Sequence, residues 1–249
     1  MSIQKTQAII LRRQEVRETS LLLIAFSRDL GKIQGLIKGV RGGRSAVPWY
    51  IEPLTLQSLV LYERRRSPVA LVSHCDLIDP FDGVRRDLTR LSYASYCLDL
   101  VDTMTENGDP HPEIFQLLLG ALKALEGGAE PKTTARFLEA HLLKASGLLP
   151  EAESLGLSAG GNMSLQQILQ TSFEGTYAAE KMTRLRLARP VEEELRRLFQ
   201  GLLCHVLDRG LKSQLFLQAL ALKSAAETTP FSVRRHNQTR TMIGSRVIR

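Results

Sequence analysis

The hydrophobic periodicity of this chain changes once, at Pro80, and that change limits the folds open to it. Before Pro80, short aliphatic segments alternate with turn signals such as RDLGK and RRRSP, a pattern typical of β-strands. After Pro80, apolar residues recur every three or four positions, a pattern typical of amphipathic helices. Strands first and helices afterwards indicate an α+β fold, with a strand-rich part at residues 1–80 and a helical part at residues 81–225.

The strand-rich part is expected to form a small closed barrel. In the segment KIQGLIK, Ile33 and Ile37 fall on one face. Lys32, Gln34 and Lys38 fall on the other, so this strand has one buried and one charged face. Five short strands suit a barrel better than an open sheet, whose edge strands would be left unpaired. The five predicted strands are residues 6–13, 20–27, 32–38, 54–62 and 69–78.

The helical part is expected to hold five helices. The first begins near Asp82, and a threonine is expected to cap the third, which ends at Gly147. Residues 148–189 are rich in glycine and give no clear assignment. The second to fifth helices are predicted from PEIFQLLLGALKALEGG, TTARFLEAHLLKASG, PVEEELRRLFQGLLCHVLDRG and LKSQLFLQALALKSA.

Positive charge is concentrated at the two ends of the chain, whose net charge is +7. Residues 1–80 hold 12 Lys and Arg against 7 Asp and Glu, whereas residues 81–225 hold 16 against 18. A polyanionic partner for the amino-terminal third follows as a hypothesis, and a basic surface that aids solubility is the alternative. The basic tail, residues 226–249, has no apolar face and is expected to be disordered and solubilising, with contact to nucleic acid as its alternative.

Motifs of enzymes, metal sites and membrane segments are not found in the sequence. It has no GxxxxGK followed by Ser or Thr, no GxSxG and no HExxH. Its three cysteines lie far apart without a CxxC, which argues against a disulfide framework and favours buried thiols. Asp99 and Asp102 are interpreted as part of a solvated helix face. A non-enzymatic protein of the cytoplasm is therefore expected, with no signal peptide and no apolar run of the roughly 18 to 20 residues that a membrane helix needs.

The predicted barrel brings its cations together if it is of the oligonucleotide-binding type. In such barrels, strands two and three and the loops that join strands one to two and four to five form the ligand groove. Cations from separate stretches of the sequence then converge on one side, which favours a nucleic-acid site. These cations are Arg12, Arg13 and Arg17 in the first loop, Lys32 and Lys38 on strand three, Arg41 and Arg44 on the loop after it, and Arg64, Arg65 and Arg66 in the four-to-five turn.

The loop IKGVRGGRSAVPWYIEP combines this charge with glycines that allow the backbone to approach a phosphate chain. Trp49 either stacks on a base or covers the end of the barrel. Aromatic residues are otherwise sparse on these strands, so binding is expected to be dominated by charge and tolerant of sequence. Engaging about six phosphates of a single strand predicts a log-log salt slope near −4.

Several segments together resemble the RecO family of bacterial recombination mediators and DNA repair proteins, over about residues 5–225. The resemblance implies an oligonucleotide-binding barrel followed by a helical domain, without enzymatic activity. It also implies binding of single- and double-stranded DNA, annealing of complementary strands, and help in loading the recombinase RecA. The implied partners are the ring protein RecR and the acidic carboxyl tail of single-strand-binding protein, in the cytoplasm at the nucleoid. The segments are AIILRR, LGKIQGLIKGVRGGRS, IEPLTLQSLVLY, LIDPFDGVRRDLTRLSYASYCLDLVD and LKSQLFLQAL.

One departure from the family concerns its four-cysteine zinc ribbon. The corresponding insert, near residues 150–185, reads LGLSAGG and SFEGTYAAE here and keeps the glycines and Phe173 but no cysteine. Since tetrahedral zinc needs four ligands and SFEGTYAAE offers only Glu174 and Glu180, no zinc and no cofactor are expected.

The resemblance also places a partner site on the third helix. Arg136 falls at a family arginine that pairs with the terminal carboxylate of the single-strand-binding protein, and Lys132 is expected to assist; an ordinary solvent-facing arginine is the alternative. A barrel that binds structured RNA is the alternative function. A hydrolase with an unrecognised site is a third class that no motif favours.

Overall fold

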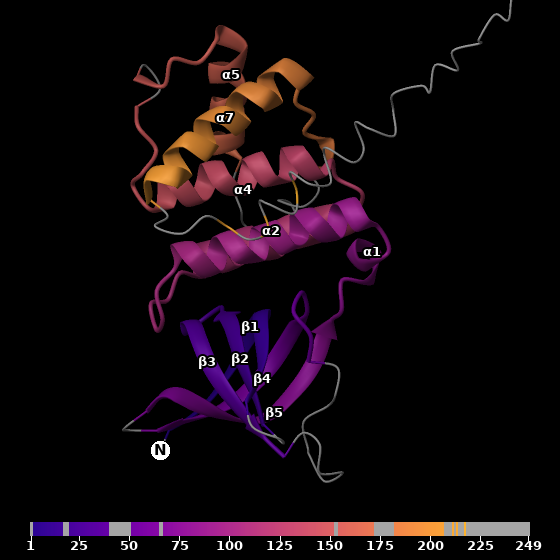
Figure 1. Ribbon diagram of the computed structural model, residues 1–249, viewed down its shortest axis with the longest axis vertical. Coiled ribbons are helices and arrows are strands. Elements are labelled where there is room, and N and C mark those ends of the chain that lie inside the picture. Colours follow the sequence, from indigo (N-terminus) through magenta and orange to yellow (C-terminus); the bar gives the residue numbers. More distant parts are fainter. Residues whose placement is uncertain are drawn as a thin grey trace, which may run out of the picture.

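The computed structural model describes residues 2–16, 20–39, 51–64, 67–151, 154–171 and 182–206, together with Leu211, Ser213 and Leu217. It contains a closed five-stranded barrel followed by helices, as the sequence predicts (Figure 1). The strand order around the barrel is β1-β2-β3-β5-β4. Its strands are β1 (Ile3–Val16), β2 (Ser20–Ser27), β3 (Gly31–Lys38), β4 (Leu56–Arg64) and β5 (Ser67–Asp79).

Successive side chains of a strand point to opposite faces, and those on the inner face fill the barrel interior with aliphatic groups. The strands pair antiparallel except for β3 and β5, which pair in parallel over three residues, Gln34 to Leu36 against Val69 to Leu71. Cys75 is buried in the interior, whereas Cys204, which the sequence led us to expect buried, is exposed. The buried interior consists of Ala8, Ile10, Leu21, Leu23, Ala25, Ile37, Ile51, Leu59, Leu61, Val72 and Cys75.

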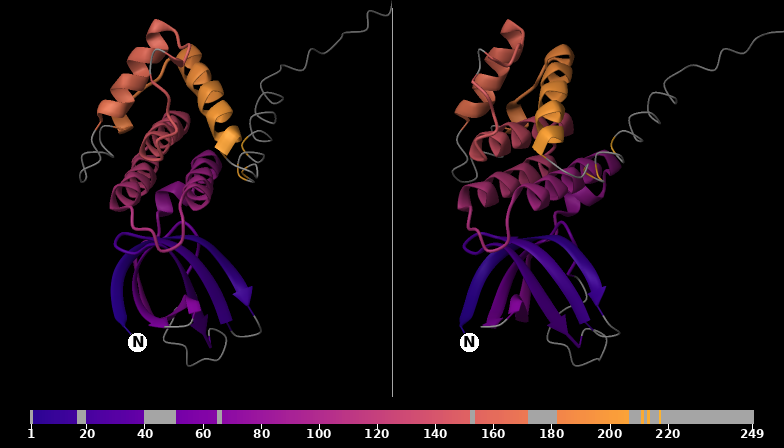
Figure 2. Two further views of the ribbon diagram at one scale, coloured as in Figure 1. Left: turned by 90° about the vertical axis from the view of Figure 1, so that its left-hand side faces the viewer. Right: turned by 60° about the vertical axis from the view of Figure 1, so that its left-hand side comes forward.

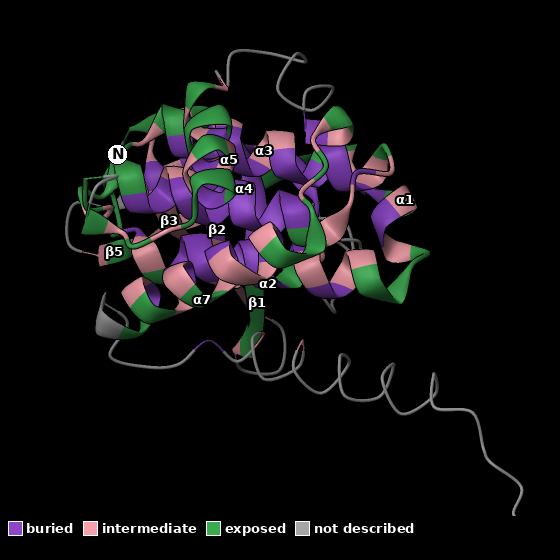
Figure 3. Ribbon diagram, turned by 90° about the horizontal axis from the view of Figure 1, so that it is seen from above, coloured by how far each residue is buried: buried purple, intermediate pink, exposed green. Residues whose placement is uncertain are grey.

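The helices form layers on one side of the barrel (Figure 2). In Figure 1, α2 lies over the barrel, α4 lies above α2, and α5 and α7 are farthest from the strands. Figure 3 shows α4 as the most buried of the helices, with buried residues along most of its length. The described helices are α1 (Asp82–Arg85), α2 (Leu88–Met104), α3 (Pro112–Glu126), α4 (Pro131–Ala145), α5 (Ala159–Gln170) and α7 (Arg189–Val206).

Three local features differ from the sequence prediction. The helix expected from Asp82 is split into α1 and α2, because the Asp87 side chain caps a new helix by accepting the N–H of Arg90. The cap of α4 is Glu130, whose carboxylate accepts the N–H of Thr133, and not a threonine. The unassigned glycine-rich segment contains α5, capped by Ser158.

The outer face of the barrel and the helices share one hydrophobic cluster, which is separate from the cluster inside the barrel. Ile9, Leu11 and Phe26 point outward from β1 and β2 and belong to the same buried cluster as the helical residues. Leu54 and Phe81, members of the same cluster, adopt left-handed backbone conformations with φ of 61° and 50°, which non-glycine residues adopt rarely. The larger buried cluster therefore crosses the strand-to-helix boundary. None of the described helices is long and apolar enough to span a bilayer.

Candidate nucleic-acid interface

The register of β2 with its two neighbours arranges side chains in rows across the outer face of the barrel. Cross-strand partners share a face, so each row points in one direction. The outer direction is identified by Ile24, which packs against the helical core, whereas Leu23 points into the barrel. The rows contain Arg12, Ile24 and Gln34; Gln14, Leu22 and Leu36; and Ser20 with Lys38.

Part of this face is open to solvent. Arg12, Gln14 and Lys38 are exposed, and Leu22, Gln34 and Leu36 are partly exposed. These six residues are called the open face below. It combines two cations, two amides and two aliphatic side chains on adjacent strands. Such a surface offers charge to phosphates and hydrogen-bonding and apolar contacts to bases.

Lys32 lies on the same side of β3 but is covered by the helical part. Its side chain is 11% exposed, and its Nζ donates to the backbone carbonyl of Asp102 at 2.5 Å. Nζ also lies 3.5 Å from Oδ1 of the Asp102 carboxylate. The sequence placed Lys32 in a ligand groove; the structure places its ammonium in the contact between barrel and helices, where a phosphate cannot reach it without displacing α2.

Arg12 shares that carboxylate but stays at the surface. Its Nε lies 2.5 Å from Oδ2 of Asp102, and its side chain is 62% exposed. Asp102 itself is 6% exposed at the side chain, so the expectation that it belongs to a solvated face was wrong. Asp99, one turn earlier, accepts a hydrogen bond from Oγ of Ser213 at 2.7 Å.

Arg13 points in another direction from Arg12. Its cross-strand partner is Leu23, an interior residue, and its Nη1 lies 2.7 Å from Oε1 of Glu52 and 3.2 Å from the carbonyl oxygen of Ile51. Arg13 and Glu52 are therefore paired next to Ile51, a residue of the barrel interior. Both Arg12 and Arg13 belong to β1 and not to the first loop, because this strand continues to Val16.

Several predicted site residues lie outside the described part of the chain. Their described neighbours border the open face: Ser20 pairs with both Val16 and Lys38, and Arg64 pairs with Ser67 at the start of β5. Two residues further along β5, Val69 pairs with Gln34 of the open face. The predicted residues that lie outside the described ranges are Arg17, Arg41, Arg44, Trp49, Arg65 and Arg66.

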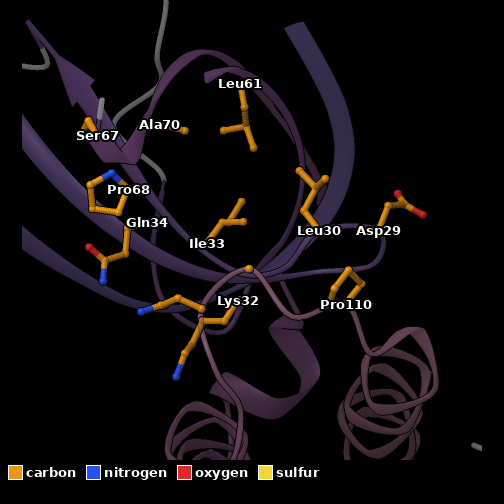
Figure 4. Close-up of a pocket in the computed structure, with 12 residues that line it drawn as sticks. Asp29, Leu30, Lys32, Ile33, Gln34, Leu61, Ser67, Pro68, Ala70 and Pro110 are labelled. Carbon is orange, nitrogen blue, oxygen red and sulfur yellow. The ribbon is translucent and has the colours of Figure 1, made fainter. Parts of the chain in front are cut away.

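A cavity of about 430 Å³ lies between the barrel and the connection from α2 to α3. Figure 4 looks into it: Leu30, Ile33 and Leu61 surround the hollow, and Lys32 lies on its helical side. Polar groups at its rim include Gln34. The cavity has no free cation among its described lining residues, since Lys32 is held by Asp102. It therefore differs in character from the open face.

The predicted partner arginine is buried. Arg136 is 4% exposed, and its Nη2 lies 3.1 Å from Oε1 of Glu139 while its Nε lies 3.8 Å from Oε1 of Glu192. The hydroxyl of Tyr96 donates to Glu139 at 2.5 Å. Burial raises the pKa of Glu139 above its ordinary value and that of Tyr96 well above its own. The solvent-facing alternative is therefore wrong, and a partner carboxylate would have to displace these contacts to reach Arg136. Lys132, in contrast, is exposed.

Metal ligands are not gathered in the described ranges of the chain, where no three His, Cys, Asp or Glu residues form a group able to hold an ion. The LGLSAGG segment leads into the first turn of α5. There Glu194 accepts hydrogen bonds from the N–H of Ser158 at 2.6 Å and from its Oγ at 2.7 Å. Residues 172–180, the second half of the ribbon segment, lie outside the described part.

Comparison with known proteins matches both parts of the chain to one family. The family model for the amino-terminal region of recombination protein O matches residues 1–81, and the model for its carboxyl-terminal region matches residues 85–158. The DNA repair protein RecO of Pelotomaculum thermopropionicum is 29% identical over 91% of this chain and 100% of that protein. The DNA repair protein RecO of Alkaliphilus metalliredigens is 33% identical, but over 60% of this chain and 61% of that protein.

Proposed function

This chain belongs to the RecO family, and on that premise we propose that it acts in recombinational DNA repair as a non-enzymatic DNA-binding protein. It binds single- and double-stranded DNA, anneals complementary strands and assists loading of the recombinase. It works in the cytoplasm at the nucleoid. This proposal combines the family membership with the chemistry of the barrel surface.

The open face is the observation that carries the DNA-binding part of the proposal. Arg12 on β1 and Lys38 on β3 supply its positive charge, and the partly exposed Leu22 and Leu36 lie in the row between them. Lys32 supports it less because its side chain is only 11% exposed, and Arg13 supports it less because it shares a face with the interior residue Leu23 and not with the open face. The proposal therefore depends mainly on Lys38, Arg12 and the basic residues of the neighbouring connections.

Annealing follows from binding of this kind. Two complementary strands repel each other through their phosphates until cations screen the charge. A surface that binds backbone charge without reading sequence holds both strands and leaves their bases to pair. The reaction needs no chemical step by the protein.

The partners are RecR and the carboxyl tail of single-strand-binding protein. Lys132, which is exposed, offers an accessible cation for that acidic tail. Nε and Nη1 of Arg136 have no hydrogen-bond partner among the described residues, so its guanidinium keeps donors for a carboxylate. The tail reaches Arg136 only if the surrounding helices move, and binding there competes with Glu139.

The test measures DNA affinity and annealing in parallel. Fluorescence anisotropy of a labelled single strand over a range of salt concentrations is expected to give a log-log slope near −4 for the wild type. Replacing Lys38, Arg41 and Arg44 together by alanine is expected to reduce that slope by about 2 units, because three phosphate contacts are lost. The same variant is expected to anneal complementary strands more slowly.

A charge-matched control replaces the exposed Arg184, Arg186 and Arg197 of the helical part by alanine. Equal losses in both variants would assign the effect to net charge and not to the barrel. If the wild-type protein binds DNA no more tightly at low salt than at high salt, the proposed function is wrong. Stronger competition by RNA than by DNA of the same sequence would favour the structured-RNA function.

A further inference from the structure

We infer that Asp102, a residue of the helical part, limits the affinity of the barrel for DNA by holding the Nε edge of Arg12. This inference rests on the proposed function, because it concerns how strongly the open face binds phosphate. Asp102 thus acts as an internal competitor of the nucleic-acid backbone.

The geometry places one carboxylate between two strands. Asp102 lies in the last turn of α2, where its Oδ2 lies 2.5 Å from Nε of Arg12 on β1 and its Oδ1 lies 3.5 Å from Nζ of Lys32 on β3. Two positive charges and one negative charge leave this cluster with a net charge of +1. The same cluster without the carboxylate has a charge of +2.

Only one of the two cations is open to a phosphate. The Arg12 side chain is 62% exposed, against 11% for Lys32. A phosphate that approaches Arg12 therefore meets a guanidinium with one edge already occupied. It also comes close to a carboxylate that is 6% exposed and is screened by salt less than a surface charge would be.

Two opposing effects act on the affinity. A carboxylate about 6 Å from a bound phosphate repels it by an amount that corresponds to about a threefold loss of affinity in bulk water without salt, and to more near a protein surface. Holding Arg12 in place also saves part of the cost of ordering it on binding. Since the contact of Arg12 among the described residues runs through Nε and the side chain stays mostly exposed, repulsion is the larger effect.

The substitution Asp102→Asn removes the charge and keeps the shape. Asparagine still offers Oδ1 as an acceptor, and Lys32 still donates to the backbone carbonyl of residue 102, one of the unsatisfied carbonyls at a helix end. Asp99→Asn is the matched control: it removes the same charge from the same helix, but Asp99 faces Ser213 and not the barrel.

The experiment compares wild type, Asp102→Asn, Asp99→Asn, Arg12→Ala and the Arg12→Ala/Asp102→Asn double variant by anisotropy with a labelled single strand. Asp102→Asn is expected to tighten binding about 3- to 10-fold and to make the salt slope steeper by about 0.7, the effect of one more neutralised phosphate. Asp99→Asn is expected to change affinity less than 2-fold. In the Arg12→Ala background the gain from Asp102→Asn is expected to fall to that of the control.

The outcomes separate this inference from the proposed function. If the wild type binds DNA with the expected salt dependence but Asp102→Asn binds no more tightly than Asp99→Asn, the inference is wrong and the function stands. Weaker binding by Asp102→Asn, with an unchanged melting temperature, would show that the carboxylate positions Arg12 and does not compete for it. A wild type without DNA affinity would overturn the proposed function itself.

Discussion

At the scale of single residues, the surroundings of His141 determine a pH dependence of stability. Its Nε2–H donates to the carbonyl oxygen of Ile168 at 3.0 Å, and burial lowers the pKa of His141 to about 4. The folded protein therefore keeps this imidazole neutral where the unfolded chain, with an ordinary pKa near 6.5, already binds a proton. Protons then favour the unfolded state in that interval.

The free energy of unfolding is accordingly expected to fall by up to about 1.4 kcal/mol per pH unit between pH 6.5 and 4 on account of His141, and to be unaffected by it above pH 6.5. Urea titrations of the wild type and of His141→Gln at pH 7.5, 6 and 5 test this. As the pH falls, the free energy of unfolding of the wild type is expected to decrease relative to that of the variant. A difference that is constant with pH would contradict the assignment.

His111 titrates in the opposite sense, which is why the comparison uses a variant and not the wild type alone. Hydrogen bonding to Glu113, with Asp109 on the other ring nitrogen, raises the pKa of His111 despite partial burial. The contribution of His111 to the free energy of unfolding is fully present below its ordinary pKa and is lost as the pH rises through the raised pKa. The wild-type pH profile therefore sums two opposing histidines.

The residue scale also shows where sequence interpretation stops. Lys32 was assigned correctly to the outer face of its strand, because alternation along a strand is local. What covers it is α2, about 70 residues away in the chain, and no local pattern reports that. A signal for Asp102 did exist: Leu98, Asp102 and Thr105 are spaced as one helix face, and all three are buried.

At the scale of elements, the start of β3 is fitted closely against the connection between α2 and α3. Gly31 has a φ of +66°, and a Cβ built there would lie 1.9 Å from the carbonyl oxygen of Asp109. Gly108 in that connection has a similar φ of +73°, and a Cβ there meets nothing within 4 Å. Its N–H donates to the carbonyl oxygen of Lys32 at 2.8 Å.

These two glycines separate backbone strain from steric overlap. Both Gly31→Ala and Gly108→Ala are expected to lose about 1–2 kcal/mol, because alanine disfavours the left-handed conformation. Gly31→Ala is expected to lose about 1–3 kcal/mol more, because Asp109 must move. Urea denaturation of the two variants tests this. Equal losses of stability would mean that the connection between α2 and α3 moves away from the new methyl group without a loss of free energy.

The elements themselves followed from the sequence to different degrees. All five strands were predicted, since alternation and turn residues fix them locally. Helix α4 was predicted in place, but the burial of Arg136 was not. That helix packs against α2, α3, α5 and α7 at once, so nearly every face is covered, and a helical period that marks one apolar face cannot show this.

At the scale of the whole molecule, the barrel depends on the helices for part of its burial. A chain shortened to residues 1–81 would expose apolar side chains that now lie in the shared core. We expect it to aggregate or to lack a cooperative unfolding transition, although it retains all five strands. These side chains are Ile9, Leu11, Phe26, Leu54 and Leu56.

Size-exclusion chromatography and thermal denaturation of the shortened and the full chain test this expectation. Replacing Phe26 by serine in the shortened chain, where it is no longer needed for packing, is expected to improve solubility. The same substitution in the full chain is expected to lower the free energy of unfolding by about 3–5 kcal/mol. A monomeric, cooperatively unfolding shortened chain would show that the barrel is independent.

The whole-molecule arrangement was predictable as a class and not in its contacts. The change of period at Pro80 indicated a barrel and then helices, and the structure has both. It did not indicate which part of the outer barrel surface the helices cover, because this depends on contacts between residues far apart in the sequence, such as Phe26 and the helical core. The open face is what this choice leaves accessible.

The meeting of β1 and β3 on one carboxylate of α2 has a consequence for how such chains diverge. Arg12, Lys32 and Asp102 form a linked set in which a neutral residue at any one position leaves the charge balance of the other two altered. We therefore expect related sequences to covary at these three positions. Sequences whose charges attach the helices more tightly to the barrel are expected to bind a polyanion more weakly, and the reverse.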